Sequence, residues 1–127
     1  MLSRRKGFTL IELIVVMIIV GVLAAIAGPL MKGNIDKAKR TEAVSALGAI
    51  RAAERCYYVQ NNTYATVTDF SANNSALRSY IGATDLAGKY YPVSAYQVNG
   101  GSTFTAYANN ATYGNVTMNQ TGTLTGD

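Results

Sequence analysis

The chain of 127 residues contains no histidine and no tryptophan, and it has a single cysteine, Cys56. Without histidine the chain lacks the commonest general base and the commonest metal ligand of proteins. One cysteine cannot form a disulfide within the chain, and together with scattered acidic residues it offers no zinc-ligand spacing. No nucleophile–base pair and no phosphate-binding loop is visible. The sequence therefore predicts no catalytic residue, no metal site and no cofactor.

Charged residues are scarce in the last third of the chain. Residues 86–126 contain no Asp or Glu, and residues 90–126 contain no Lys or Arg. The net charge of +4 comes largely from Arg4, Arg5 and Lys6, since the remaining eight basic residues face seven acidic ones. We therefore expect no direct nucleic-acid binding, because a phosphate-binding groove needs Lys or Arg beside its aromatic residues. Basic residues beside an apolar segment instead form a topology signal that keeps this end in the cytoplasm.

An apolar segment follows this basic end. From Phe8 to Met31 the only ionisable side chain is Glu12. The segment has about the length that a helix needs to cross a bilayer. Pro29 lies near its end, and because proline lacks an N–H and crowds the preceding turn, we expect a kink near residues 25–29.

Helical spacing of apolar residues continues beyond the apolar segment. Basic and hydroxyl side chains occupy the opposite side of this stretch, so we predict one helix from about Phe8 to about Gln60 whose second half is amphipathic. Cys56 is expected to be buried on its apolar side, and Asp36, Glu42 and Glu54 are expected to form solvated pairs with nearby Lys and Arg. The apolar positions are Ile35, Ala43, Ala46, Leu47, Ile50, Ala53 and Tyr57.

The rest of the chain predicts a small antiparallel sheet. After a loop with one short helical turn over residues 75–81, strands are expected over residues 90–98, 103–109 and 115–120, separated by Gly- and Asn-containing turns. Most of the nine tyrosines are expected to be half-buried sheet residues with their hydroxyl groups at the surface. A meander of this kind can cover the amphipathic half of the helix. The predicted fold class is α+β, with a long N-terminal helix packed on the sheet.

The junction Arg4-Arg5-Lys6-Gly7-Phe8-Thr9-Leu10-Ile11-Glu12-Leu13-Ile14 resembles the processing signature of type IV prepilins and of the related type II secretion pseudopilins. In that family a membrane peptidase cuts after the glycine that ends a basic leader, and it methylates the new N-terminal residue. Pro29 also lies where the family commonly has a helix-interrupting proline.

The resemblance implies a domain organisation and a location. Residues 1–7 would be a cleaved leader, residues 8–31 a transmembrane and assembly helix, and residues 32–127 a globular domain on the periplasmic or extracellular side. Cleavage would follow Gly7, and Phe8 would be N-methylated. The precursor would lie in the inner membrane with its N-terminus in the cytoplasm, and an ATP-driven assembly machine would lift it into a helical homo-oligomeric filament.

Glu12 can be interpreted from its chemistry. A carboxylate at the centre of a bilayer costs about 2.5–3.5 kcal/mol on insertion scales, so a lone one indicates a specific role. Cleavage after Gly7 would leave a positively charged amine on Phe8, and Glu12 of one subunit could pair with that amine on a neighbour. Such a pair would fix the axial stagger of subunits. The alternative is a carboxylate that is merely favoured by the dipole at a helix N-terminus.

Three functional alternatives stay open. The first is the subunit of a type IV pilus used in adhesion, motility or DNA uptake, although the chain lacks the C-terminal disulfide loop of many pilins. The second is a pseudopilin of type II secretion, although major pseudopilins commonly carry an acidic calcium-binding loop and residues 86–126 have no acid. The third is a soluble secreted enzyme or binding module, released by cleavage of Ala25-Ile26-Ala27-Gly28 as an ordinary signal-peptide site.

Overall fold

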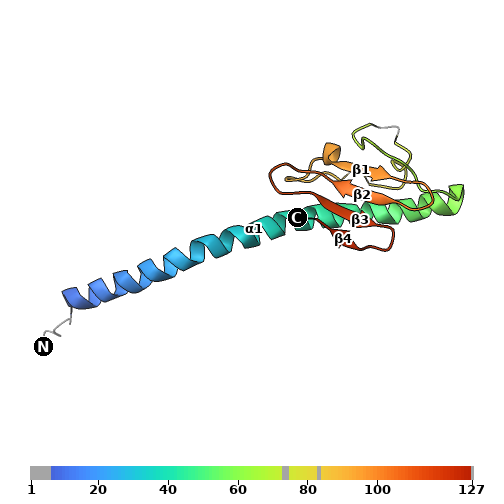
Figure 1. Cartoon of the computed structure of the whole chain (residues 1–127). Coiled ribbons are helices and arrows are strands. Elements are labelled where there is room, and N and C mark those ends of the chain that lie inside the picture. The colour runs from blue at the N-terminus through green and yellow to red at the C-terminus, as the bar shows by residue number, and fades with distance from the viewer. Residues whose placement is uncertain (1–6, 73–74, 83, 127) are drawn as a thin grey trace, which may run out of the picture. The chain divides into compact units, whose positions relative to one another are not determined.

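The computed structural model describes residues 7–72, 75–82 and 84–126 and has the α+β class that the sequence predicts. One long helix comes first and a four-stranded antiparallel sheet follows (Figure 1). The predicted helix from Phe8 to Gln60 is confirmed closely. In chain order the elements are α1 (Leu10–Asn61), the 3₁₀ turn η1 (Val93–Ala95), β1 (Tyr96–Asn99), β2 (Thr105–Ala108), β3 (Val116–Asn119) and β4 (Leu124–Thr125).

The chain divides into two units, residues 1–35 and residues 36–127, and α1 contributes to both. In the first unit every described residue is exposed. The helix is continuous through Pro29, because the helical assignment is unbroken on both sides of it. The kink predicted near residues 25–29 stays a prediction.

In the second unit, α1 buries one stripe of its surface against the sheet and the connecting loops. This stripe confirms the predicted amphipathic face, although Ile35 is exposed and Tyr57 is only half-buried. Its spacing of three and four residues keeps all its members on one side of a helix with 3.6 residues per turn. The buried apolar members are Ala43, Ala46, Leu47, Ile50 and Ala53.

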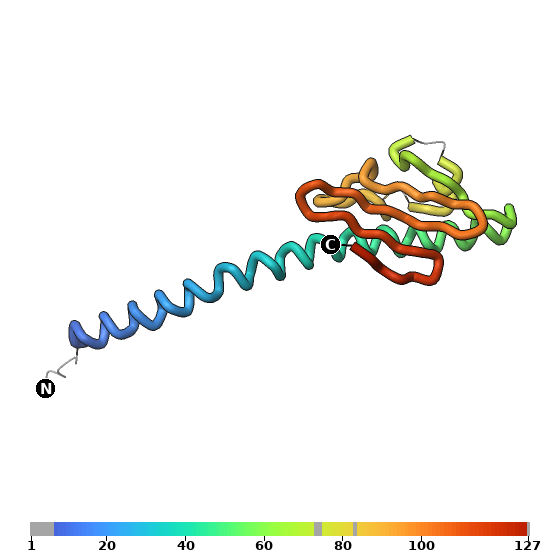
Figure 2. The backbone as a smooth tube through the Cα atoms, in the orientation of Figure 1, coloured from blue at the N-terminus to red at the C-terminus, as the bar shows by residue number. Residues whose placement is uncertain are grey.

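The sheet is a meander in the order β1-β2-β3-β4, with every neighbouring pair antiparallel (Figure 2). In β1, β2 and β3 buried and more exposed residues alternate, so one face of the sheet packs on the core. The strands predicted over residues 103–109 and 115–120 are confirmed as β2 and β3. The sequence did not predict β4, which is only two residues long and exposed.

The strand predicted over residues 90–98 is wrong in its first half, because β1 begins only at Tyr96. Pro92 has a φ of −67° and no N–H to donate to a ladder. The backbone N–H groups of Tyr90 and Tyr91 are also occupied, since both donate to the Glu42 carboxylate. Over residues 75–81 the predicted helical turn is a series of turns in which Arg78 and Tyr80 donate to the carbonyls three residues earlier.

Glu42 joins α1 to the segment before β1. Its Oε2 accepts the N–H of Lys89 at 3.0 Å, and its Oε1 accepts those of Tyr90 at 2.8 Å and Tyr91 at 2.7 Å. Burial opposes ionisation, but the three backbone N–H groups prevail and lower the pKa of Glu42 below its usual value. The prediction of a solvated helix-face pair is therefore wrong for Glu42, whereas Asp36 does pair with Lys39 at 3.3 Å.

Two further side chains of α1 depart from the sequence prediction. Glu54 is fully buried instead of solvated, and its Oε2 accepts the N–H of Ala65 at 2.9 Å. Cys56 is exposed instead of buried. At 100° per residue Cys56 lies about 120° around the helix from the buried Ile50, which places it outside the packed stripe.

The tyrosines were also predicted only in part. Tyr107 in β2 is half-buried as expected, but Tyr91 and Tyr96 are completely buried. The Tyr91 hydroxyl group donates to the carbonyl of Gly114 at 2.9 Å, which compensates its burial. Loop residues supply much of the remaining core, namely Ala65, Val67, Phe70, Leu77, Ile81, Leu86 and Phe104.

Candidate processing and assembly site

The junction between Gly7 and Phe8 is open. Gly7 has no atom within 4 Å of the position that a Cβ would occupy, and the side chain of Phe8 is 87% exposed. Both residues precede the first helical residue, Leu10. The peptide at this junction is therefore exposed and lies outside the helix.

Thr9 and Glu12 form a capping box at the start of α1. The Thr9 N–H and hydroxyl group donate to Glu12 Oε2 at 2.9 and 3.0 Å, and the Glu12 N–H donates to the Thr9 Oγ1 at 3.3 Å. This reciprocal arrangement satisfies donors that a helix N-terminus leaves unpaired. The dipole of α1 also favours a negative charge at this end. Glu12 is therefore held in a defined position beside the N-terminus.

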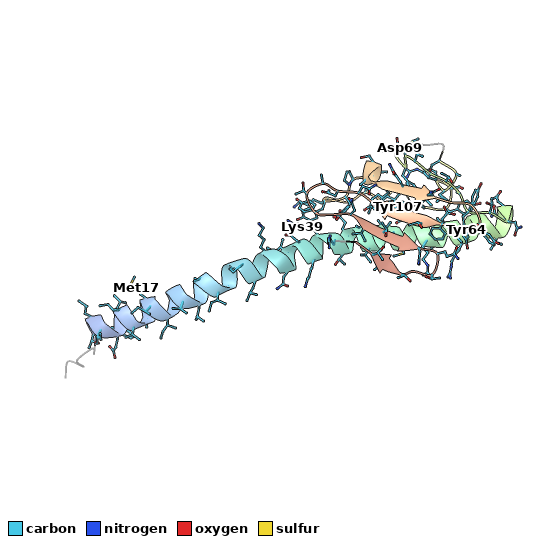
Figure 3. The ribbon with its side chains drawn as sticks, viewed as in Figure 1. Met17, Lys39, Tyr64, Asp69 and Tyr107 are labelled. Atoms are coloured by element: carbon cyan, nitrogen blue, oxygen red, sulfur yellow. The ribbon has the colours of Figure 1, made fainter. Side chains whose placement is uncertain are left out.

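The surface of α1 that follows Glu12 is apolar on all sides. An 18-residue window has a mean hydropathy of 3.0, and none of it is buried, so by length and composition this helix qualifies to cross a membrane. Met17 is one of the side chains that project from it (Figure 3), with 70% of its surface exposed. The other largely exposed residues of this surface include Val20, Leu23, Ile26, Leu30 and Met31.

Glu12 lies in the first turn of α1, and its predicted pairing with the amine of a neighbouring subunit stays a prediction. The structure also shows a residue whose role the sequence argument missed. Thr9 holds the Glu12 carboxylate, and the pattern Thr-x-x-Glu before an apolar run was the available signal. Arg4, Arg5 and Lys6, predicted as the topology signal, lie outside the described residues. In the described part of the chain, His, Cys, Asp and Glu form no group of three or more that could hold a metal ion.

Two family models match the chain. The prokaryotic N-terminal methylation motif matches residues 2–28, and a model described as the type IV minor pilin ComP, DNA uptake sequence receptor, matches residues 29–125. The chain belongs to this type IV pilin family. Pilins and the related pseudopilins are structural subunits that assemble into filaments, so the family is not one of enzymes.

Relatives of this chain include type II secretion proteins and a fimbrial protein. Type II secretion system core protein G of Klebsiella pneumoniae is 43% identical over 65 residues, which are 51% of this chain and 46% of the relative. The same protein of Klebsiella michiganensis is 34% identical over 96 residues, 74% of this chain and 63% of the relative. A fimbrial protein of Neisseria meningitidis is 34% identical over 99 residues, 78% of this chain and 53% of the relative.

The chain spans about half the length of the curated relatives it matches. No solved structure matches it significantly.

Proposed function

We propose that this chain is the subunit of a type IV pilus filament, processed after Gly7 and assembled through residues 8–31. The observation that carries the proposal is the exposed apolar half of α1, most of which lies within the match to the methylation motif. A helix that is apolar on all sides needs lipid or other apolar helices around it. In the membrane, lipid surrounds residues 8–31, and in a filament the same residues of neighbouring subunits replace the lipid.

The processing step exploits the open junction. A peptidase on the cytoplasmic side uses water to hydrolyse the bond between Gly7 and Phe8 and releases the basic leader of residues 1–7. It then transfers a methyl group from a methyl-donor cosubstrate to the new amine of Phe8, which gives up a proton. The processed subunit stays anchored by residues 8–31, with residues 32–127 on the periplasmic side. Loss of Arg4, Arg5 and Lys6 removes the charges that hold this end in the cytoplasm, which allows the assembly machinery to extract the subunit.

Glu12 sets the register between subunits. In the isolated chain its carboxylate is held by Thr9, and in a bundle of parallel helices it reaches the positively charged amine of Phe8 on a neighbour. A buried charge without a partner costs free energy. The axial offset between subunits that pairs Glu12 with the amine is therefore favoured over offsets that leave Glu12 unpaired. The capping box keeps the carboxylate at the helix start until the neighbour arrives.

The experiment that tests this assembly role compares two carboxylates of α1. Glu12→Ala should reduce the yield of sheared filaments about tenfold or more, while the subunit still accumulates in the membrane. Asp36→Asn is the matched control, because Asp36 lies outside the apolar segment and forms one ion pair with Lys39. Wild-type filament yield from Glu12→Ala would contradict the registry role.

The type II secretion pseudopilus is the second filament that the comparisons support, since relatives of both kinds match. The pilus is favoured by the pilin model that covers residues 29–125 and by the absence of acidic residues from residues 86–126. A deletion strain separates the two functions. Loss of long surface filaments with normal enzyme secretion supports a pilus, and loss of enzyme secretion supports a pseudopilus.

A DNA-receptor function is favoured by one observation, the description of the family model that matches residues 29–125. Against it, none of the four strands carries Lys or Arg, and the expectation of no direct nucleic-acid binding stays a prediction. Electrophoretic mobility of duplex DNA with the full chain in detergent decides the matter. Sequence-selective retardation at physiological salt would establish the receptor function and would contradict our expectation.

A further inference from the structure

Among the described residues, Glu54 is the only charged side chain that is fully buried. Its Oε2 accepts the N–H of Ala65 at 2.9 Å, but its Oε1 has no hydrogen-bond partner. An ionised carboxylate with an unpaired oxygen in such surroundings is costly, whereas a protonated carboxyl carries no charge. The geometry therefore favours the neutral form of Glu54 in the folded domain.

No basic side chain of α1 offsets a charge on Glu54. Arg51, one turn earlier, is engaged elsewhere, because its guanidinium donates to the carbonyls of Gln120 and Thr121 at 3.1 Å each. Arg55 is exposed and has no hydrogen bond or ion pair in the described chain.

Two titratable groups that follow Glu54 on α1 are phenols, and a third phenol lies in β1. On α1, Tyr57 packs edge-on against Tyr80, and Tyr58 stacks on Tyr64, which comes from the segment after the helix. In β1 the phenol is Tyr96, and its electrostatic neighbours are Glu42 and Tyr91. None of these hydroxyl groups bonds to the Glu54 carboxyl, so Ala65 is its single polar contact.

The contact to Ala65 ties α1 to residues 63–67, which we call the edge segment. β1 is the first strand of the sheet and would otherwise have a free edge. Val67 and Val98 exchange backbone hydrogen bonds of 2.9 and 2.7 Å across that edge, and the Tyr64 N–H donates to the Gly101 carbonyl at 2.9 Å. The edge segment therefore covers the open side of β1, and Glu54 holds it against the helix. Tyr64, beside the last turns of α1, marks the segment in Figure 3.

We propose that Glu54 is a proton-operated latch, which holds the edge segment closed when its carboxyl is neutral and loosens it when the carboxyl ionises. On ionisation the Oε1 proton passes to bulk water, and the carboxylate is left without a counter-ion unless the segment moves and admits water. Opening exposes the edge of β1, and an uncovered strand edge is a site at which another chain can pair. The latch is a property of the folded domain and does not rest on the pilus proposal.

The acid–base behaviour of Glu54 agrees with this geometry. Burial raises the pKa of Glu54 to about 7, against the smaller opposing effect of the Ala65 N–H. In the open state the carboxyl is solvated and has the ordinary value of 4.5. The closed state therefore binds more protons between these two values, and closure weakens as the pH rises from 4.5 to about 7.

Two measurements on the full chain in detergent micelles test the latch. Carboxyl ¹³C NMR follows the titration of Glu54 directly, and amide hydrogen exchange reports the opening of the edge segment at pH 5 and pH 8 after correction for intrinsic exchange rates. In the wild-type chain the protection of the edge segment should fall about tenfold or more from pH 5 to pH 8. Glu54→Gln keeps an acceptor for the Ala65 N–H and cannot ionise, so in this variant the protection of the edge segment should change less than about twofold between pH 5 and pH 8.

Glu42→Gln is the control, because Glu42 is a carboxylate of the same helix whose two oxygens are both hydrogen-bonded. It should retain the wild-type pH response of the edge segment. Titration of Glu54 below about pH 5.5 in the wild-type chain would overturn the latch, whether or not Glu54→Gln folds. Equal pH dependence in wild type and Glu54→Gln would overturn it as well.

Discussion

The two halves of α1 belong to one continuous helix, but only the second half buries side chains. Residues 13–31 are apolar on all sides, and every residue from 10 to 35 is exposed. Residues 36–61 are less apolar and supply five alanine, leucine and isoleucine residues to the core. The difference lies in the pattern, because a single apolar stripe can be covered by one small sheet and an all-round apolar surface cannot. Hydrophobicity thus indicates the need for a partner, and periodicity indicates whether the same chain supplies it.

Matched leucine substitutions give the largest expected contrast between the two halves. Leu47 is completely buried, so Leu47→Ala should lower the free energy of unfolding of the C-terminal domain by about 2–5 kcal/mol, measured by denaturant titration in detergent. Leu23, 63% exposed in the apolar half, is the control, and Leu23→Ala should leave that free energy unchanged. An equal loss of unfolding free energy in both variants would contradict the view that only the second half of α1 packs in the domain.

Two carboxylates that bind backbone N–H groups extend the comparison. Glu42→Gln should destabilise the domain by about 1–2 kcal/mol, because it replaces charge-assisted hydrogen bonds to residues 89–91 by neutral ones. Glu12→Gln should leave domain unfolding unchanged and reduce filament yield instead.

The pH dependence of the Glu42 effect has a definite sign. The folded pKa of Glu42 lies below the unfolded value of 4.5, so its contribution is present above pH 4.5 and is lost as the pH falls through the folded pKa. The destabilisation by Glu42→Gln should therefore shrink in acid. A loss of folding stability in Glu42→Gln that becomes larger as the pH falls would contradict the hydrogen bonds assigned to Glu42.

Arginine substitutions within the packed half have a smaller expected effect. Arg51→Ala removes two hydrogen bonds to carbonyls at the turn between β3 and β4, and it should cost about 1–2 kcal/mol in thermal or chemical unfolding. Arg55 lies four residues later and is exposed, so Arg55→Ala should change the free energy of unfolding by less than about 0.5 kcal/mol. A similar cost for both variants would show that net charge matters and the turn contact does not.

Gly48→Ala gives the smallest expected change, and its sign is opposite. Gly48 is exposed in the packed half, and the position of its Cβ is empty to 4 Å, so alanine should raise domain stability by about 0.5–1 kcal/mol through its better helix propensity. Gly21→Ala in the apolar half should leave domain unfolding as it is. A destabilised Gly48→Ala variant would indicate that a neighbouring subunit packs closely there.

The helix, its buried stripe and two of the four strands were predictable, because each rests on a local period that this sequence displays clearly. The start of β1 was not predictable, because the N–H groups of Tyr90 and Tyr91 donate to Glu42, which lies nearly fifty residues earlier in the chain. Burial of Glu54 escaped prediction for the same reason, as its partner Ala65 lies in a loop without periodicity. Long-range contacts of single polar groups leave no periodic signal in the sequence.

The residues of the candidate site were assigned from the sequence in two different ways, and their roles stay predictions. Glu12 stands out because it is the only ionisable residue from Phe8 to Met31, whereas Gly7 and Phe8 were assigned from the resemblance of residues 4–14 to the prepilin signature. The partner of Glu12 in the isolated chain, Thr9, required the geometry of the capping box. The partner that we propose in the filament lies on another subunit, so one chain shows only the position from which Glu12 would reach it.

The most direct test of the central claim is the N-terminal residue and intact mass of the mature subunit from membranes and sheared filaments. The account predicts a chain that begins with N-methylated Phe8 and retains Glu12 and the whole of α1. A mature chain that begins at Gly28 would contradict it, because the assembly helix and its carboxylate would both have been removed.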